Sequence, residues 1–102
     1  MISIGDKAPE FNVSINGGAQ FTLADAADKN LVLYFYPKDD TPGCTKEAIS
    51  FSENLDTFKD QNTVVLGVSR DTVSKHDKFI TKFDLRINLI SDEDGSLCEA
   101  FG

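Results

Sequence analysis

The chain has 102 residues, which is the length of one domain with a single hydrophobic core. Hydrophobic residues make up 40% of the sequence and the formal net charge is −7, so the composition is that of a folded, acidic protein. This charge argues against a nucleic-acid partner and against an anionic membrane surface, because both bind clustered Lys and Arg. We expect a cytoplasmic protein, since no apolar run is long enough to span a membrane and residues 1–7 lack a signal-peptide pattern.

The N-terminal residues predict a β-hairpin. Apolar and polar residues alternate over residues 11–15, which is typical of a half-buried strand. Asn16-Gly17-Gly18 follows as a strong turn signal, and residues 20–23 predict the returning strand. Residues 24–30 predict a short helix or a polar connection.

Three apolar runs then predict buried strands, at residues 31–36, 63–69 and 87–90. The first run ends at Pro37, which cannot donate a hydrogen bond to a sheet. Because the first two runs do not alternate with polar residues, we expect both faces of these strands to be covered, as in a parallel sheet.

Helices are predicted between these strands, at residues 42–60 and 72–84, and another begins at Ser96 after a turn. Their apolar faces are Ala48, Phe51, Leu55 and Phe58 in the first helix, and Val73, His76, Ile80 and Phe83 in the second. On this face we expect His76 to be a partly buried histidine with satisfied hydrogen bonds. The alternating order predicts an α/β fold in one domain that spans residues 1–102.

The strongest candidate for a chemically reactive residue is Cys44. It follows the strand at residues 31–36, which we expect to be central, and open α/β sheets place their sites beyond the carboxyl ends of such strands. Thr41 is a good N-cap residue and Pro42 suits the first helical position, so Cys44 is predicted in the first turn of a helix.

This position favours a reactive sulfur. The unpaired N–H groups and the dipole of a helix N-terminus stabilise a thiolate. Gly43 has no side chain to shade the sulfur, and the Thr41 hydroxyl is placed to hydrogen-bond a group beside it. A lone cysteine in a first helical turn is nevertheless more often inert than catalytic, so position alone leaves both alternatives open.

The sequence around Cys44 resembles that of a known family. The pattern Pro37-x-x-x-Thr41-x-x-Cys44 is similar to the peroxiredoxin signature. Tyr34-Phe35-Tyr36-Pro37 and Thr41-Pro42-Gly43-Cys44-Thr45-Lys46-Glu47 resemble the peroxiredoxin Q, or bacterioferritin comigratory protein, subfamily. Further similarities run along the chain, at residues 5–11, 65–71, 76–79, 89–95 and 98–102.

The resemblance implies a thioredoxin-like fold, with three α/β/α layers and a mixed sheet, and a peroxidase that reduces hydrogen peroxide and organic hydroperoxides without a metal or other cofactor. Cys44 would be the peroxidatic thiolate, which becomes a sulfenic acid. Thr41 would hydrogen-bond the peroxide, Pro37 would shield the sulfur from water, and Glu47 would orient an arginine. Backbone N–H groups near Cys44 would bind the peroxide oxygens.

The chain departs from the subfamily in its second cysteine. Many members have a resolving cysteine in the same helix, at the position of Ile49, or in the next helix, where this chain has none. We expect Cys98 to be a half-buried helix residue and not the resolving thiol. The chain then resembles a one-cysteine variant, which thioredoxin or a low-molecular-weight thiol would regenerate.

A second departure is that the family continues beyond Gly102 with a hairpin and a closing helix. The hairpin provides an arginine that pairs with the thiolate. The arginines of this chain are Arg70 and Arg86, and we expect Arg70 to be a surface charge. We therefore expect residues 1–102 to be an incomplete domain, a monomer or weak homodimer that a complementary C-terminal segment would complete.

Two other functions are alternatives to the peroxidase. A thioredoxin-fold redox sensor or binding module without turnover is consistent with the missing arginine and resolving cysteine. A disulfide oxidoreductase is disfavoured, because the sequence has no Cys-x-x-Cys pair.

Overall fold

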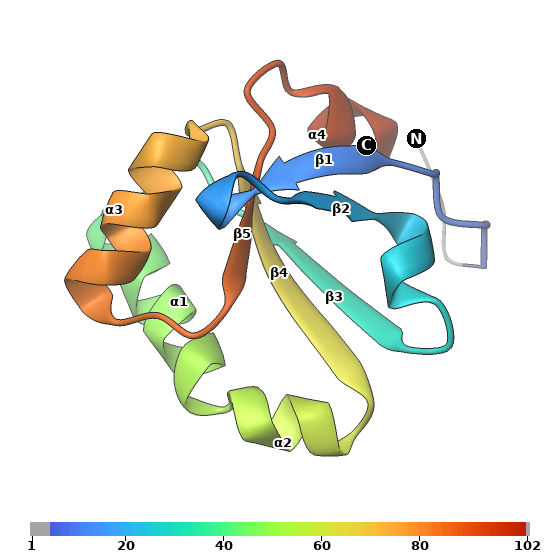
Figure 1. Ribbon diagram of the computed structural model, residues 1–102, viewed down its shortest axis with the longest axis horizontal. Coiled ribbons are helices and arrows are strands. Elements are labelled where there is room, and N and C mark those ends of the chain that lie inside the picture. Colours follow the sequence, from blue (N-terminus) through green and yellow to red (C-terminus); the bar gives the residue numbers. More distant parts are fainter. Residues whose placement is uncertain (1–4, 102) are drawn as a thin grey trace.

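Strands and helices alternate from β3 onward in the computed structural model, which describes residues 5–101 (Figure 1). The strands are β1 (Asn12–Ile15), β2 (Gln20–Thr22), β3 (Asn30–Phe35), β4 (Thr63–Ser69) and β5 (Asn88–Ser91). The helices are α1 (Pro42–Glu53), α2 (Leu55–Asp60), α3 (Val73–Phe83) and α4 (Ser96–Phe101), with short 3-10 turns η1 (Asn16–Gly18) and η2 (Leu23–Ala26). In this part of the chain no helix is long and apolar enough to cross a membrane.

The five strands form one mixed sheet in the order β2-β1-β5-β4-β3. β3, β4 and β5 pair in parallel, whereas β1 pairs antiparallel with both β2 and β5. The predicted hairpin, α/β class and mixed sheet are therefore confirmed. β3 lies at the edge of the sheet in the described residues, so the prediction that the strand before Cys44 is central is wrong.

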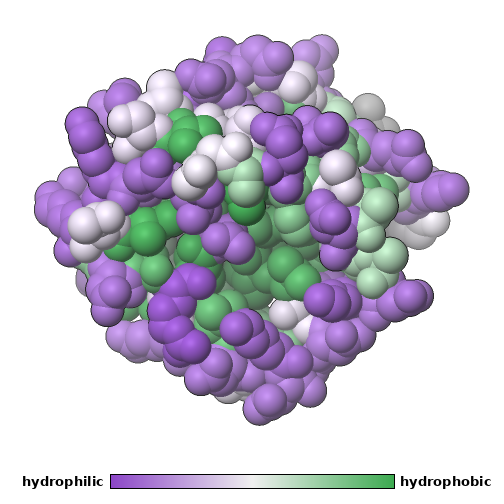
Figure 2. Space-filling view, in the orientation of Figure 1, coloured by the Kyte–Doolittle hydropathy of each residue, from purple (hydrophilic) through white to green (hydrophobic). Residues whose placement is uncertain are grey.

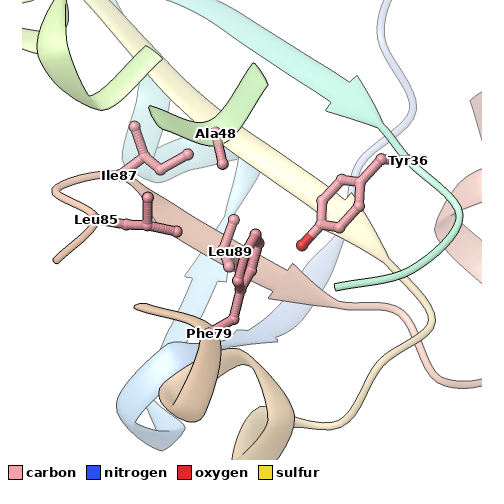
Figure 3. Packing of buried hydrophobic residues seen from close by; sticks show 6 residues of the cluster. All are labelled: Tyr36, Ala48, Phe79, Leu85, Ile87 and Leu89. Carbon is pink, nitrogen blue, oxygen red and sulfur yellow. The ribbon is translucent and has the colours of Figure 1, made fainter. Parts of the chain in front are cut away.

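One face of the sheet is covered by α1 and α3. Figure 3 shows the buried side chains between these helices and the strands, where Ala48 of α1 and Phe79 of α3 meet Leu89 of β5. The whole cluster consists of Tyr36, Ala48, Phe79, Leu85, Ile87 and Leu89. Each fully buried aliphatic or aromatic side chain of this kind stabilises the fold by about 1.5–3 kcal/mol relative to exposure.

A close approach between β3, β4 and this core requires a glycine. Gly67 of β4 is in register with Tyr34 of β3, and a Cβ at Gly67 would lie 2.7 Å from both Cζ and Oη of Tyr34. The Tyr34 ring also stacks on Phe51 of α1, with 4.6 Å between ring centroids. Gly67 thus provides the space for an aromatic layer between the sheet and α1.

The opposite face is covered less completely, by α4 and the N-terminal hairpin. Its buried side chains are Leu66, Val68, Ile90 and Leu97, and the hairpin adds residues that are only partly buried. Phe35 at the end of β3 is 41% exposed. Figure 2 shows apolar surface gathered in the middle of the molecule, over β4 and β3 as they lie in Figure 1. Leu31 and Leu33 of β3 pack on this face but are only partly buried, so the strand at residues 31–36 is covered in part on each face within the described residues.

The helix predicted over residues 42–60 is divided into α1 and α2 at Asn54. Asn54 has φ −99° and ψ 10°, and its side-chain Nδ2 donates to the Ser50 carbonyl at 2.8 Å. Asparagine competes in this way with regular helical hydrogen bonds. The predicted apolar face survives the division, because Ala48 is buried and Phe51 and Leu55 pack against the same core.

Candidate active site

Cys44 lies in the first turn of α1, as predicted. The chain leaves β3, and Thr41 has the extended backbone of an N-cap residue before Pro42 begins the helix. The Cys44 side chain is half-buried and packs against the core that contains Tyr36 and Phe79. The sulfur is therefore supported by packed side chains on one side while part of it remains accessible to a small reagent.

The backbone N–H groups at the start of α1 are free to bind an anion. The Thr41 hydroxyl does not cap the helix and instead donates to the Lys38 carbonyl at 3.2 Å. Pro42 has no N–H, and no hydrogen bond within residues 5–101 uses the N–H of Gly43 or Cys44. These two donors and the helix dipole are available to stabilise negative charge on sulfur or on a bound oxygen atom.

Cys98 is the third residue of α4, the same helical position that Cys44 has in α1. The N-terminus of α4 is already occupied by a carboxylate. Asp92 accepts from the Leu97 N–H at 2.9 Å and from the Cys98 N–H at 3.0 Å. Because those donors are used and a negative charge lies beside them, this position does not favour a second thiolate.

The two cysteines lie in different surroundings. Both are free thiols, and Cys98 is exposed, not half-buried as predicted. Its helix packs on the less covered face of the sheet through Leu97, whereas Cys44 packs on the α1 and α3 face. Pro37 is exposed and lines a surface hollow with Phe35, Tyr36 and Cys98. Its shielding of Cys44 stays a prediction.

Two tyrosine rings lie in the core beside Cys44, stacked with 5.6 Å between their centroids. Burial raises the pKa of the Tyr34 hydroxyl above its ordinary value, and the negative charges of Glu47 and Asp39 raise it further. Burial, followed by a hydrogen bond to Asp39, likewise raises the pKa of Tyr36. Both hydroxyls therefore stay protonated at neutral pH.

Phe35 lies between Tyr34 and Tyr36 in the sequence, but its ring is on the other face of the sheet. It is packed against Phe101 of α4, with 6.1 Å between ring centroids, on the opposite face of the sheet. Phe35 therefore does not line the side of the sheet on which Cys44 packs.

A buried polar cluster that sequence reasoning missed lies under the loop between β3 and α1. Asp39 in this loop is 9% exposed and bonds to the hydroxyl of Tyr36 and the ring of His76. Its backbone N–H donates to Asp71, at the end of β4. The histidine on the apolar face of α3 was the one signal of such a cluster, and it did not identify the partners.

Comparison with known proteins places this geometry in a family. The model of the AhpC/TSA family matches residues 4–102. A protein of Coxiella burnetii named putative peroxiredoxin bcp is 45% identical over 101 residues, which cover 99% of this chain and 67% of that protein. The chain belongs to the AhpC/TSA family.

Solved structures of peroxiredoxins share the fold. Peroxiredoxin Q of Xanthomonas campestris has a TM-score of 0.86 and 47% sequence identity, over 89% of this chain and 58% of that chain. The mitochondrial 1-Cys peroxiredoxin of yeast has a TM-score of 0.92 and 26% identity, over 99% of this chain and 51% of that chain. The thioredoxin-like fold and the resemblance to peroxiredoxin Q are confirmed, and this AhpC/TSA chain spans about half to two thirds of the length of these relatives.

The arginines of this AhpC/TSA chain are engaged away from Glu47. Arg70 is exposed and donates from Nε and Nη2 to the Glu93 carbonyl, each at 3.2 Å. Arg86 pairs with Asp56 at 3.0 Å. Glu47 is exposed one turn after Cys44, and no ion pair within residues 5–101 joins it to an arginine. Its predicted role stays a prediction.

Proposed function

We propose that this chain reduces hydrogen peroxide and organic hydroperoxides through Cys44. The observation that supports this most strongly is the pair of free N–H groups, of Gly43 and Cys44, at the start of α1 beside a half-buried sulfur. The sulfur of the thiolate attacks the distal peroxide oxygen, so that an S–O bond forms as the O–O bond breaks. The leaving oxygen takes up a proton and departs as water or alcohol, and Cys44 is oxidised to a sulfenic acid.

The neighbouring residues have separate roles in this proposal. The N–H groups of Gly43 and Cys44 stabilise the charge that develops on the peroxide oxygens, as an oxyanion hole does. Thr41 turns its hydroxyl from the Lys38 carbonyl to the peroxide, and Gly43 leaves room for that substrate. Pro37 limits access of water, and Glu47 orients an arginine when one is present.

The reductant in this proposal is an external thiol, either thioredoxin or a low-molecular-weight thiol. One thiol displaces water from the sulfenic acid to give a mixed disulfide, and a second thiol then releases Cys44. The similar yeast mitochondrial 1-Cys peroxiredoxin has a thiol resolving mechanism via glutathione/thioredoxin systems. A free thiolate of this kind needs a reducing compartment, which supports a cytoplasmic location.

The less covered face of the sheet supports a further part of the proposal. Apolar surface and the free edge of β3 are exposed in residues 5–101, with Phe35 at the end of that edge. Exposed apolar surface and an unpaired strand edge favour association. We expect a monomer that self-associates weakly, or one whose open face is covered by a complementary C-terminal segment.

A redox sensor or binding module without turnover is the second candidate. It is favoured by the placement of Arg70 and Arg86, whose guanidinium groups contact other residues and not Glu47. Without an arginine near the sulfur, the thiolate and the peroxide lack a charge-assisted partner. Such a protein would form the sulfenic acid slowly and would not sustain repeated cycles.

Consumption of hydrogen peroxide in the presence of dithiothreitol separates these functions. The wild-type chain is compared with Cys44→Ser, and Cys98→Ser is the matched control for loss of one thiol. We expect Cys44→Ser to fall to the uncatalysed rate and Cys98→Ser to remain close to wild type. Equal rates for wild type and Cys44→Ser would reject the peroxidase.

A further inference from the structure

The loop between β3 and α1 determines where Cys44 lies, and it contains a strained residue. Asp40 has φ 60°, in the left-handed region that residues other than glycine rarely adopt. Its side chain pairs with Lys82 of α3 at 2.7 Å, but both side chains are largely exposed, so this ion pair contributes little. A strained residue persists only when its surroundings hold it in place. The neighbouring Asp39 provides that restraint.

Both oxygens of the Asp39 side chain, and its backbone N–H, are bonded to different parts of the fold. Oδ1 accepts from the Tyr36 hydroxyl at 2.5 Å, and Oδ2 lies 2.7 Å from Nδ1 of His76 in α3. The Asp39 N–H donates to Oδ2 of Asp71 at 2.8 Å. Asp71 is itself held by the Ser69 hydroxyl at 2.8 Å. The loop is thus joined to the ends of β3 and β4 and to α3.

His76 is the member of this cluster that is deepest in the fold. It is 0% exposed, and its Nε2 donates to the Ile90 carbonyl of β5 at 2.9 Å. Since a carbonyl can only accept, Nε2 must carry a proton. The contact between His76 Nδ1 and Asp39 Oδ2 then holds one shared proton, either on the ring or on the carboxyl group. A buried polar group that loses such a partner costs about 1–3 kcal/mol.

We propose that His76 is a positioning residue for Cys44. His76 connects β5 to Asp39, and Asp39 fixes the loop that leads into Thr41 and the free N–H groups of Gly43 and Cys44. The effect of His76 on the rate of Cys44 oxidation rests on the proposed function. The effect of His76 on the loop between β3 and α1 does not depend on any activity.

Two substitutions at His76 separate positioning from simple core packing. The amide nitrogen of Asn superposes on Nδ1, so His76→Asn keeps the bond to Asp39 and loses the bond to Ile90. The amide nitrogen of Gln superposes on Nε2, so His76→Gln keeps the bond to Ile90 and loses the bond to Asp39. Each variant leaves one buried acceptor without its donor, so the two are expected to be destabilised to a similar degree.

Two readouts are measured on the full chain. The first is amide hydrogen exchange at Asp39 and Thr45, whose N–H groups donate to Asp71 and to the Thr41 carbonyl, and the second is the rate constant for oxidation of Cys44 by hydrogen peroxide. We expect His76→Gln to increase exchange and to slow oxidation by on the order of 10²-fold, as misplacement of reacting groups by about 1 Å does. We expect His76→Asn to stay within about tenfold of wild type, a smaller loss because its reacting groups keep their placement.

Each outcome has a definite meaning. Equal exchange and equal oxidation rates in the two variants would overturn the proposal, because packing alone would explain them. A difference in exchange, with wild-type Cys44 unreactive toward peroxide, would keep the loop anchor and reject the peroxidase. If either variant fails to fold, Asp39→Asn, which can bond to both Tyr36 and His76, is compared with Asp39→Ala, which can bond to neither. Similar exchange and oxidation in those two variants would also overturn the proposal.

Discussion

Replacement of Gly67 by alanine tests the aromatic layer on which Cys44 packs. A Cβ at this position would lie 2.7 Å from Cζ and Oη of Tyr34 and 2.8 Å from Cδ2 of Leu89. Neither side chain has room to move away. The Tyr34 ring is stacked against both Tyr36 and Phe51, and Leu89 is 0% exposed.

The expected cost follows from two opposed effects. Overpacking a core position costs about 1–3 kcal/mol. Alanine in a strand is more favourable than glycine by roughly 0.5–1 kcal/mol, because glycine loses more backbone freedom on folding. At the middle of both ranges, the free energy of unfolding of Gly67→Ala should therefore fall by about 1 kcal/mol, which lowers the melting temperature of a domain of this size by roughly 4–8 °C.

Thermal unfolding followed by circular dichroism measures this change, with Gly43→Ala as the matched control. A Cβ at Gly43 would meet no atom within 4 Å, and the residue is helical. The control should be as stable as wild type or slightly more so, since alanine favours a helix. A Gly67→Ala protein that melts at or above the wild-type temperature would refute the account of the close approach between β3 and β4.

Three further predictions concern the second cysteine and the open face. Asp92→Ala should lower the free energy of unfolding by about 0.5–2 kcal/mol, because it removes the cap of α4, and should speed alkylation of Cys98 by iodoacetamide. Unchanged alkylation of Cys98 would show that Asp92 does not restrain this thiol. Oxidation with one equivalent of peroxide, followed by digestion without reductant, should yield no dominant disulfide between Cys44 and Cys98, and its appearance would make Cys98 the resolving thiol. Sedimentation of the 102-residue chain should show self-association through the apolar face and the β3 edge. A monomer that melts cooperatively and has full peroxidase activity would contradict the expectation of an incomplete domain.

The sequence predicted the features that depend on neighbouring residues. The hairpin turn, the three parallel strands and the first turn of α1 follow from local signals, such as Asn16-Gly17-Gly18 and Thr41-Pro42. The break at Asn54 also has a local cause, but the sequence did not reveal it. The apolar residues on both sides of Asn54 still face the core, so the helical spacing continues across the break.

Features that depend on distant residues were not predicted. The edge position of β3 follows from the pairing of β4 with β5, which no local pattern reports. Asp39 and His76 are 37 positions apart, and Asp92 caps a helix too short to show periodicity. In each case a polar side chain finds its partner only after the strands and helices have assembled.

The central claim is that Cys44, and not Cys98, is the thiol that reacts with peroxide. The wild-type chain is treated with one equivalent of hydrogen peroxide in the presence of dimedone, which traps sulfenic acids, and the modified peptides are quantified by mass spectrometry. The free N–H groups at α1 and the carboxylate at α4 predict that the adduct forms on Cys44 with little on Cys98. An adduct found mainly on Cys98 would contradict the account.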